Sequence, residues 1–209
     1  MRNILIYLRY IGIGVIFLSA CTKQSVIDSG VSNGIHQGSM MAYFKTDSYN
    51  WDSTIVIIKR ANLETLFSGK DNAHPQITFW GPTNHSIRRY MLVNNINSIQ
   101  DIPVDLCREM ILKHVLDKRF LKNEFAFRNP SYSISDPRGG GTEFNCLAGN
   151  QLRAYKEQYN DPAAPNVGPI YLRLYSVTSQ IDVPVASADI QTDNGVVMSL
   201  GYDYLLGNI

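Results

Sequence analysis

Tyrosine and arginine side chains alternate with aliphatic ones in the second half of the chain. In residues 170–175, Tyr171, Arg173 and Tyr175 occupy every second position. This is the period of a β-strand, whose successive side chains point to opposite faces. By the same reasoning Tyr155 lies on the outward face of the preceding strand. Flat rings beside hydrogen-bonding groups suit sugar rings and protein interfaces alike. We therefore expect Tyr155, Tyr171, Arg173 and Tyr175 to form a ligand-binding surface. The open alternative is that tyrosine is simply a good strand former.

Motifs typical of catalysis are missing from the sequence. It has no Gly-x-Ser-x-Gly elbow, no phosphate loop followed by Lys-Ser or Lys-Thr, and no His-Glu-x-x-His. Residues 138–142, Arg-Gly-Gly-Gly-Thr, lack the lysine of a phosphate loop and are predicted to be a loop that enters a strand. A pair of glycosidase carboxylates needs proximity only in space, and no spacing suggests one. The sequence therefore predicts no catalytic residue and no cofactor.

Cysteine and histidine spacing argues against a metal site. Cys107 and Cys146 form no Cys-x-x-Cys pair and lie at no zinc-type spacing from histidine. In an exported protein they could form one disulfide, or Cys107 could be a small buried hydrophobe on the apolar stripe of a helix. His114 falls on that same stripe and is predicted to be a hydrogen-bonded core histidine.

The N-terminus has the pattern of an export signal. Residues 1–10 carry Arg2 and Arg9 and no acid, and residues 11–18 are apolar. This run is too short for a permanent membrane span, which needs about 20 apolar residues. Small residues, Ser19 and Ala20, follow it. We therefore expect residues 1–20 to be a cleaved signal peptide.

The four residues Leu-Ser-Ala-Cys at positions 18–21 resemble the lipobox of bacterial lipoproteins, in which the cysteine sulfur receives a diacylglycerol. The resemblance implies lipid attachment at Cys21, with fatty acyl chains such as palmitate holding the chain to the cell outer membrane. Two or three acyl chains bury enough CH₂ groups, at about 0.8 kcal/mol each, for stable attachment. The alternative is an ordinary secretory signal in which Cys21 is incidental.

Composition limits the remainder of the chain. Removal of residues 1–20 from the 209 leaves enough for one domain, and the loss of Arg2 and Arg9 leaves 17 basic against 18 acidic residues. That balance gives no basic surface of the kind that nucleic acids require, so no nucleic-acid partner is expected. Residues 21–41 are rich in Ser, Gly, Asn and Gln and are predicted to be a flexible tether, followed by one folded domain over residues 42–209.

Helices are expected first and strands afterwards. Apolar spacing predicts helices over residues 51–69, from Thr83 or Asn84 onward, and over residues 103–116, with a short strand at residues 77–80. After about residue 119 the period changes to two, with turns at 138–141, 148–150, 161–165 and 193–195. This order predicts an α+β domain whose helices pack on an antiparallel sheet system.

Three stretches resemble the fasciclin-type domain of cell-surface adhesion proteins. Residues 77–84, Ile-Thr-Phe-Trp-Gly-Pro-Thr-Asn, are similar to the family's first motif, a strand that runs into Ala-Pro-Thr-Asn and a helix. Residues 110–116 resemble the helix that usually ends in Tyr-His-Val. Residues 188–197, with Asp-Asn-Gly-Val-Val, resemble the second motif. The resemblance implies a single fasciclin-like domain in which N-terminal helices pack on an antiparallel β-rich wedge.

The chain departs from the family at three places. It has Trp80-Gly81 in the first motif, Lys113 for the usual tyrosine, and Met198 where histidine usually follows. In animal relatives the Tyr-His region is associated with receptor binding, and only His114 of it remains. The Asn194-Gly195 pair is by itself a strong turn signal. The motifs therefore specify fold and not chemistry.

Together these features predict a membrane-anchored binding module without enzymatic activity, at the cell surface or, as the open alternative, on the periplasmic face of the outer membrane. In gut-type Bacteroidetes such lipoproteins accompany outer-membrane polysaccharide uptake systems, so the resemblance implies adhesion, or glycan capture and assembly, with a glycan or a cell-surface protein as partner. The alternative is a secreted glycan-active hydrolase, which would require a cleft with two carboxylates of different pKa.

Overall fold

The computed structural model describes residues 34–163 and 167–209. The predicted signal peptide, Cys21 and most of the predicted tether lie outside the described residues. Within those ranges, no helix combines the length and the apolar character needed to cross a membrane. Residues Gly34–Ile209 form one unit.

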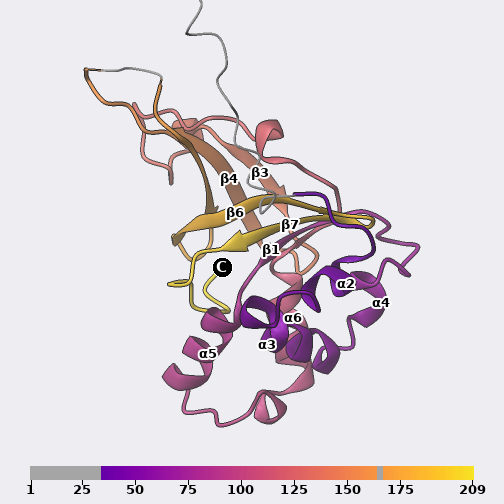
Figure 1. Cartoon of the computed structure of the whole chain (residues 1–209). Helices are drawn as coiled ribbons and strands as arrows, with labels where there is room; N and C mark the ends of the chain where they lie inside the picture. Colours follow the sequence, from indigo (N-terminus) through magenta and orange to yellow (C-terminus); the bar gives the residue numbers. More distant parts are fainter. Residues whose placement is uncertain (1–33, 164–166) are drawn as a thin grey trace, which may run out of the picture. The chain divides into compact units, whose positions relative to one another are not determined.

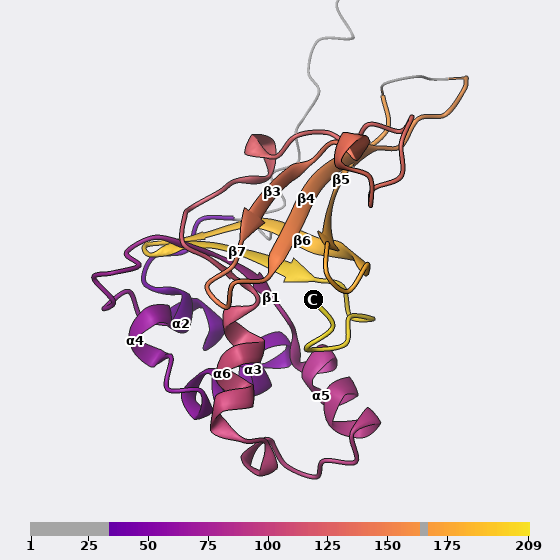
Figure 2. The same cartoon turned by 180° about the vertical axis from the view of Figure 1, so that it is seen from behind.

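Five α-helices precede or flank a seven-stranded sheet in this unit (Figure 1). The helices are α2 (Met40–Phe44), α3 (Ser48–Arg60), α4 (Glu64–Phe67), α5 (Asn84–Val93) and α6 (Val104–Leu112). The strands are β1 (Ile77–Gly81), β2 (Val115–Leu116), β3 (Thr142–Asn145), β4 (Gln151–Gln158), β5 (Ile170–Ser176), β6 (Asp182–Thr192) and β7 (Gly195–Leu200). Short 3-10 turns lie at Ile99–Asp101, Lys122–Glu124 and Pro137–Gly139. The helices gather on one side of β1 and β7, and β3 to β5 lie at the other end of the sheet (Figure 2).

The sheet is mixed, with the strand order β2-β1-β7-β6-β5-β4-β3. The first and last strands in sequence, β1 and β7, pair in parallel, while every other neighbouring pair of described strands is antiparallel. The predicted α+β class is confirmed. The predicted antiparallel arrangement is wrong at the β1–β7 pair, because two helices and five other strands separate β1 from β7 in sequence and no short hairpin fixes their relative direction.

Helix boundaries differ from the periodic pattern at two places. The single helix predicted over residues 51–69 is two helices, α3 and α4, because Asn62 adopts a left-handed conformation with φ 55° and ends the first one. The helix predicted to reach residue 116 ends at Leu112, because Val115 and Leu116 pair with β1 as strand β2. In both cases apolar residues that fit the helical spacing belong to the next element: Leu66 and Phe67 lie in α4, and Val115 lies in β2.

The folded unit begins before residue 42. Met40 and Met41, which the sequence pattern assigns to the tether, lie in α2 and are buried. Ahead of them, Ile35 forms a parallel bridge with Gln191 of β6. The side chain of Asn194, in the turn before β7, accepts a hydrogen bond from Met40 N at 2.8 Å. The tether boundary predicted at residue 41 is therefore too late, because polar composition does not reveal pairing with a distant strand edge.

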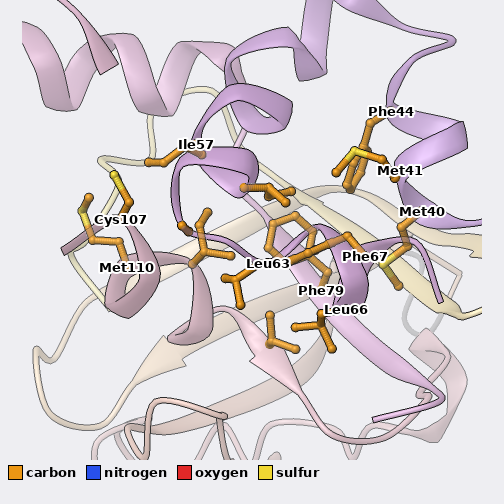
Figure 3. Close-up of a cluster of buried hydrophobic side chains, with 14 of the residues drawn as sticks. Met40, Met41, Phe44, Ile57, Leu63, Leu66, Phe67, Phe79, Cys107 and Met110 are labelled. Atoms are coloured by element: carbon orange, nitrogen blue, oxygen red, sulfur yellow. The ribbon is translucent and has the colours of Figure 1, made fainter. Parts of the chain in front are cut away.

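Two hydrophobic clusters occupy opposite faces of β1 and β7. Phe79 belongs to the cluster beneath the helices, with Met40, Phe44 and Phe67 (Figure 3). Val197 and Ile111 belong to the same cluster. Trp80 and Val196 belong to the other cluster, with Phe125, Leu152, Leu174 and Met198. Successive residues of a strand point to opposite faces, which explains why every residue of β1 and β7 is buried.

Candidate functional site

The tyrosines predicted on the C-terminal sheet do not share one surface. Tyr171 is 53% exposed, whereas Tyr155 is 1% and Tyr175 is 4% exposed. Arg173 is half-buried. The prediction that Tyr155 and Tyr175 face solvent is therefore wrong. Only Tyr171 and Arg173 remain within reach of a ligand.

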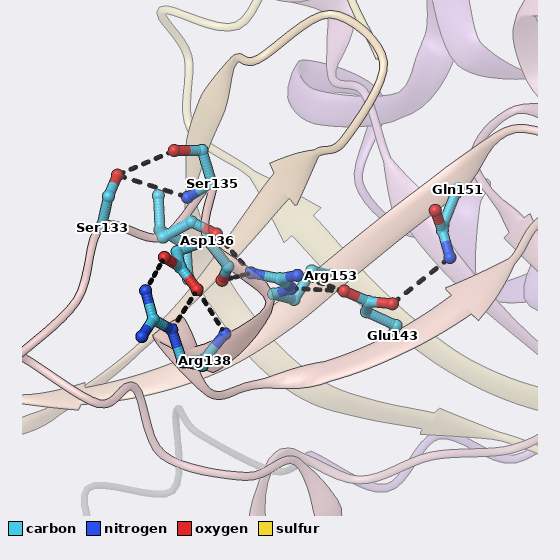
Figure 4. A network of polar contacts seen from close by, with 8 residues as sticks. Ser133, Ser135, Asp136, Arg138, Glu143, Gln151 and Arg153 are labelled. Carbon is cyan, nitrogen blue, oxygen red and sulfur yellow. Dashed lines mark hydrogen bonds and ion pairs between the residues drawn. The ribbon is translucent and has the colours of Figure 1, made fainter.

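Residues 127–141 cover this face of the sheet. Arg153 of β4, which shares the face with Tyr155, is 3% exposed. Its guanidinium donates to Glu143 and to the backbone oxygens of Ile134 and Asp136 in the covering segment (Figure 4). Gly141 has φ 85°, and a Cβ there would lie 3.0 Å from the Ala154 oxygen, so glycine allows the segment to approach β4 closely. Strand alternation cannot reveal such a cover, because it assumes that the second face meets water.

A closed polar cluster surrounds Tyr155. Its hydroxyl donates to Asp182 Oδ2 at 2.8 Å, and Arg173 Nε lies 2.9 Å from the same carboxylate oxygen. Arg173 Nε also lies 3.1 Å from the Tyr155 hydroxyl. Burial, reinforced by the Asp182 charge, raises the pKa of Tyr155 well above its usual range. The Tyr155 hydroxyl and Arg173 share Asp182 Oδ2, so the cluster holds β4, β5 and β6 together, while Asp182 Oδ1 is buried without a partner among the described residues.

His114 is a core residue, as the sequence predicts. It is fully buried, its Nδ1 donates to the Met110 oxygen at 2.6 Å, and its Nε2 accepts from the Tyr204 hydroxyl at 2.8 Å. Burial lowers the pKa of His114 to about 4, so the ring is neutral at pH 7. The receptor contact that the family resemblance associates with this region has no exposed group at His114.

Cys107 and Cys146 are both buried and free. The disulfide alternative is therefore not the one adopted, and burial raises the pKa of Cys146 to about 12. Among the residues that the structure describes, no group of three His, Cys, Asp or Glu side chains could hold a metal ion.

A hollow of about 230 Å³ lies where the helices meet the bulged part of β6. We name it the Tyr202 hollow. Its helical side is lined by Tyr43, Asp47, Asn50 and Trp51, and its sheet side includes Ser187, Ser199 and Tyr202. Register shifts between Val185 and Ile190 interrupt the pairing of β6 with β7 at this point. Bulges of this kind bend a strand and re-aim its side chains, and they are frequent beside functional sites.

Three aromatic side chains lie beside this hollow and form an exposed surface that we name the aromatic shelf: Tyr49, His85 and Tyr202. The ring centroids of His85 and Tyr202 are 4.5 Å apart, and those of Tyr49 and His85 are 5.6 Å apart. Tyr49 is 67% and Tyr202 is 48% exposed. On its other side the shelf borders a second hollow of about 660 Å³, lined by α5 residues that include Arg88, Arg89 and Leu92.

Sequence reasoning missed this surface. Its residues come from α3, α5 and the segment after β7. The Tyr202 hydroxyl donates to Asn50 Oδ1 at 2.9 Å across a separation of 152 positions. The one local signal is the polar cap at the start of α3, where Asp47 accepts from Asn50 N. A cap is normally read as a helix boundary and does not indicate what packs beside it.

The structure is similar to that of a FAS1 domain pair from the insect cell adhesion molecule fasciclin I. The TM-score is 0.40 at 14% sequence identity, and the match covers 81% of this chain and 45% of that chain. The chain thus spans less than half the length of that structure. No family model matches the sequence, and no curated protein matches it.

Proposed function

We propose that this chain is a lipid-anchored binding module of the outer membrane that captures a glycan or a cell-surface protein and catalyses no reaction. The observation that carries the proposal is the aromatic shelf, in which Tyr202 is half-exposed and borders a hollow on each side. Exposed aromatic rings beside polar groups are typical of surfaces that bind sugars or proteins. The proposal that the domain is a fasciclin-type wedge with an adhesive role rests on the three sequence motifs.

The anchor in this proposal is Cys21, which lies outside the described residues. Because the sulfur would carry the lipid, Cys21→Ala should leave the chain unprocessed or should release it from membranes. The measurement is membrane fractionation with immunoblotting of the wild type and the variant. A normally processed, membrane-bound Cys21→Ala protein would show that the lipid is not on this residue.

A screen of the full-length protein in detergent micelles tests the binding function. A glycan array and a pull-down from surface extracts would each be repeated with Tyr49→Ala/Tyr202→Ala and, as the matched exposed-tyrosine control, with Tyr171→Ala. The shelf variant should lose binding. If Tyr171→Ala or Arg173→Ala loses it instead, the contact lies on the accessible remainder of the C-terminal sheet surface.

The hydrolase alternative is tested with the same glycans. Incubation with the protein, followed by chromatography of the products, should show no cleavage. Cleavage into shorter sugars that persists through further purification of the protein would overturn the proposal that it only binds.

A further inference from the structure

We propose that the Tyr202 hollow binds one neutral sugar ring, with the remainder of the glycan lying along the aromatic shelf. This inference rests on the proposed binding function and names its site and ligand class. It is carried by a buried donor without an acceptor, by the charge of the lining, and by the size of the hollow.

The unpaired donor is the indole N–H of Trp51. This side chain is 1% exposed, and no described residue supplies a hydrogen-bond partner for its Nε1. A buried polar group without a partner costs folding free energy, and native structures contain few of them. A group of this kind at the wall of a hollow indicates that an acceptor is supplied from outside.

Trp51 lines the hollow together with Tyr43. The far corner of its six-membered ring faces Gly81, where a Cβ would lie 2.8 Å from Cη2 and Cζ3. The edge that carries Nε1 is on the other side, toward Tyr43. Burial raises the pKa of the Tyr43 phenol, and the nearby Trp51 indole opposes that rise. The indole N–H and the phenol do not, however, meet the geometry of a hydrogen bond. A ligand oxygen would therefore reach Nε1 by displacing the half-buried Tyr43 side chain.

The other wall carries a chain of acceptors and donors. Asp47 accepts from Asn50 Nδ2 at 2.7 Å, and Asn50 Oδ1 accepts from the Tyr202 hydroxyl at 2.9 Å. Ser187 and Ser199 are opposite each other in the β6–β7 register and add two hydroxyl groups. Sugar hydroxyls both donate and accept, which suits a wall of this mixed character.

The charge of the lining selects against acidic ligands. Of the nine described residues that line the hollow, Asp47 alone is charged. A carboxylate or phosphate bound there would meet a like charge without a compensating cation, whereas the hydroxyls of a neutral sugar can donate to Asp47. The ligand class is therefore a neutral sugar and not a uronic acid or a sugar phosphate.

The size of the hollow fits a single ring. Its 230 Å³ is smaller than the roughly 300–1,000 Å³ of pockets for drug-sized ligands. Tyr202 belongs both to the hollow and to the shelf, so a second sugar unit that leaves the hollow meets His85 and then Tyr49. Stacking of sugar CH faces on these rings would add contact outside the hollow.

Trp51 makes the proposal directly measurable. The chain has two tryptophans, and the other one, Trp80, is buried in the opposite cluster. In a Trp80→Phe background, the full-length protein in detergent would be titrated with the methyl glycosides of glucose, galactose, mannose and N-acetylglucosamine, and Trp51 emission would be followed. Calorimetry of the wild type with the same sugars keeps the test independent of that background. At least one glycoside should give saturable binding.

Three variants separate the site from general effects. Tyr202→Ala, and Ser187→Leu, which fills the hollow, should each weaken binding about ten-fold or more, and Tyr171→Ala should leave it unchanged. Asp47→Asn retains a good helix cap but removes the charge, so it should raise the affinity for methyl glucuronide relative to methyl glucoside. Circular dichroism confirms folding of each variant.

The result that overturns the inference is distinct from failure of the proposed function. If none of the four glycosides binds while the array or pull-down detects a ligand, the protein is a binding module but the Tyr202 hollow is not its sugar site. Equal binding of methyl glucuronide and methyl glucoside by the wild type, or unchanged binding by folded Tyr202→Ala and Ser187→Leu, also overturns it. If no screen detects any ligand, the proposed function itself fails.

Discussion

The face of β4 and β5 that holds Tyr155 and the Tyr202 hollow are both rich in tyrosine and polar groups, yet they differ in where those groups find their partners. On β4 and β5, Arg153 and Arg173 are bound to Glu143, Asp182 and backbone oxygens of the same chain. At the hollow, Trp51 Nε1 has no partner and the Tyr202 ring is half-exposed. Residue type alone therefore does not distinguish a structural polar surface from a binding one. Each region has a buried polar atom without a partner among the described residues, Asp182 Oδ1 on the sheet and Trp51 Nε1 at the hollow. The distinction lies in whether the polar groups border an open hollow, as they do around Tyr202.

The largest effect expected on stability concerns two tyrosines of the same strand. Tyr175→Ala removes a buried ring and should lower the free energy of unfolding by roughly 3–5 kcal/mol. Tyr171→Ala removes an exposed ring and should change it by less than about 0.5 kcal/mol. Urea denaturation of both variants measures the difference. Similar values would mean that residues 127–141 do not close this face.

The next effect is a dependence of stability on pH. Because the pKa of folded His114 is lowered to about 4 from 6.5, the unfolded chain binds a proton that the folded chain excludes. The stabilisation is complete above pH 6.5 and should be lost as the pH falls through 4, by about 3 kcal/mol in total. Denaturation curves between pH 7 and 4 measure it. His114→Gln should remove this component of the slope, and His85→Gln on the shelf should retain it.

A smaller effect is expected from the buried arginine. Arg153→Met should cost about 2 kcal/mol, because Glu143 and two backbone oxygens lose their donor, although the half-exposed Glu143 can turn to water. The exposed Arg88 beside the second hollow is the matched control, and Arg88→Met should leave stability unchanged. An equal loss of stability in both variants would show that the arginine on the sheet face is no more important for folding than the arginine beside the second hollow.

The smallest effect is expected from the ion pair between Arg89 and Asp203, whose side chains are 49% and 97% exposed. Exposed pairs contribute little, so Asp203→Asn should leave the melting temperature unchanged to within about 2 °C. Because stability is unchanged, any loss of binding in the same variant would reflect a lost contact with the ligand and not unfolding. A large fall in melting temperature would show that this side of the molecule also depends on its polar contacts for stability.

Local sequence patterns predicted the elements whose apolar residues form a helical stripe or a short continuous run. The strand at residues 77–80, the helix after Thr83 and the core position of His114 are as expected. The pattern failed where a distant segment covers the second face, as at Tyr155, and where Asn62 and the β1–β2 pairing end helices early. Those outcomes depend on tertiary contacts that leave no periodic signal in the local sequence.

The candidate site was not predictable for a related reason. Its groups are contributed by Tyr43 and Trp51, near one end of the described residues, and by Ser199 and Tyr202 near the other. The parallel pairing of β1 with β7 brings the segment after β7 to the helices that precede and follow β1. The tyrosines of β5, by contrast, are easily recognised in the sequence because they alternate with aliphatic residues within one short segment.

The N-terminal pairing with Gln191 has a mechanical consequence. Between Gly34 and Met40 the chain makes five hydrogen bonds to the β6–β7 hairpin: Gly34 O to Gln191 N, His36 N to Gln191 O, Gly38 N to Asp193 Oδ2, Gly38 O to Asp193 N, and Met40 N to Asn194 Oδ1. Any force that arrives from the side of Cys21 meets these bonds before it reaches a helix. A pull along β6 loads them together in shear, whereas a pull away from the sheet opens them one at a time from Gly34. If the chain is tethered through Cys21, as proposed, it would therefore resist tension in one direction far better than in the other.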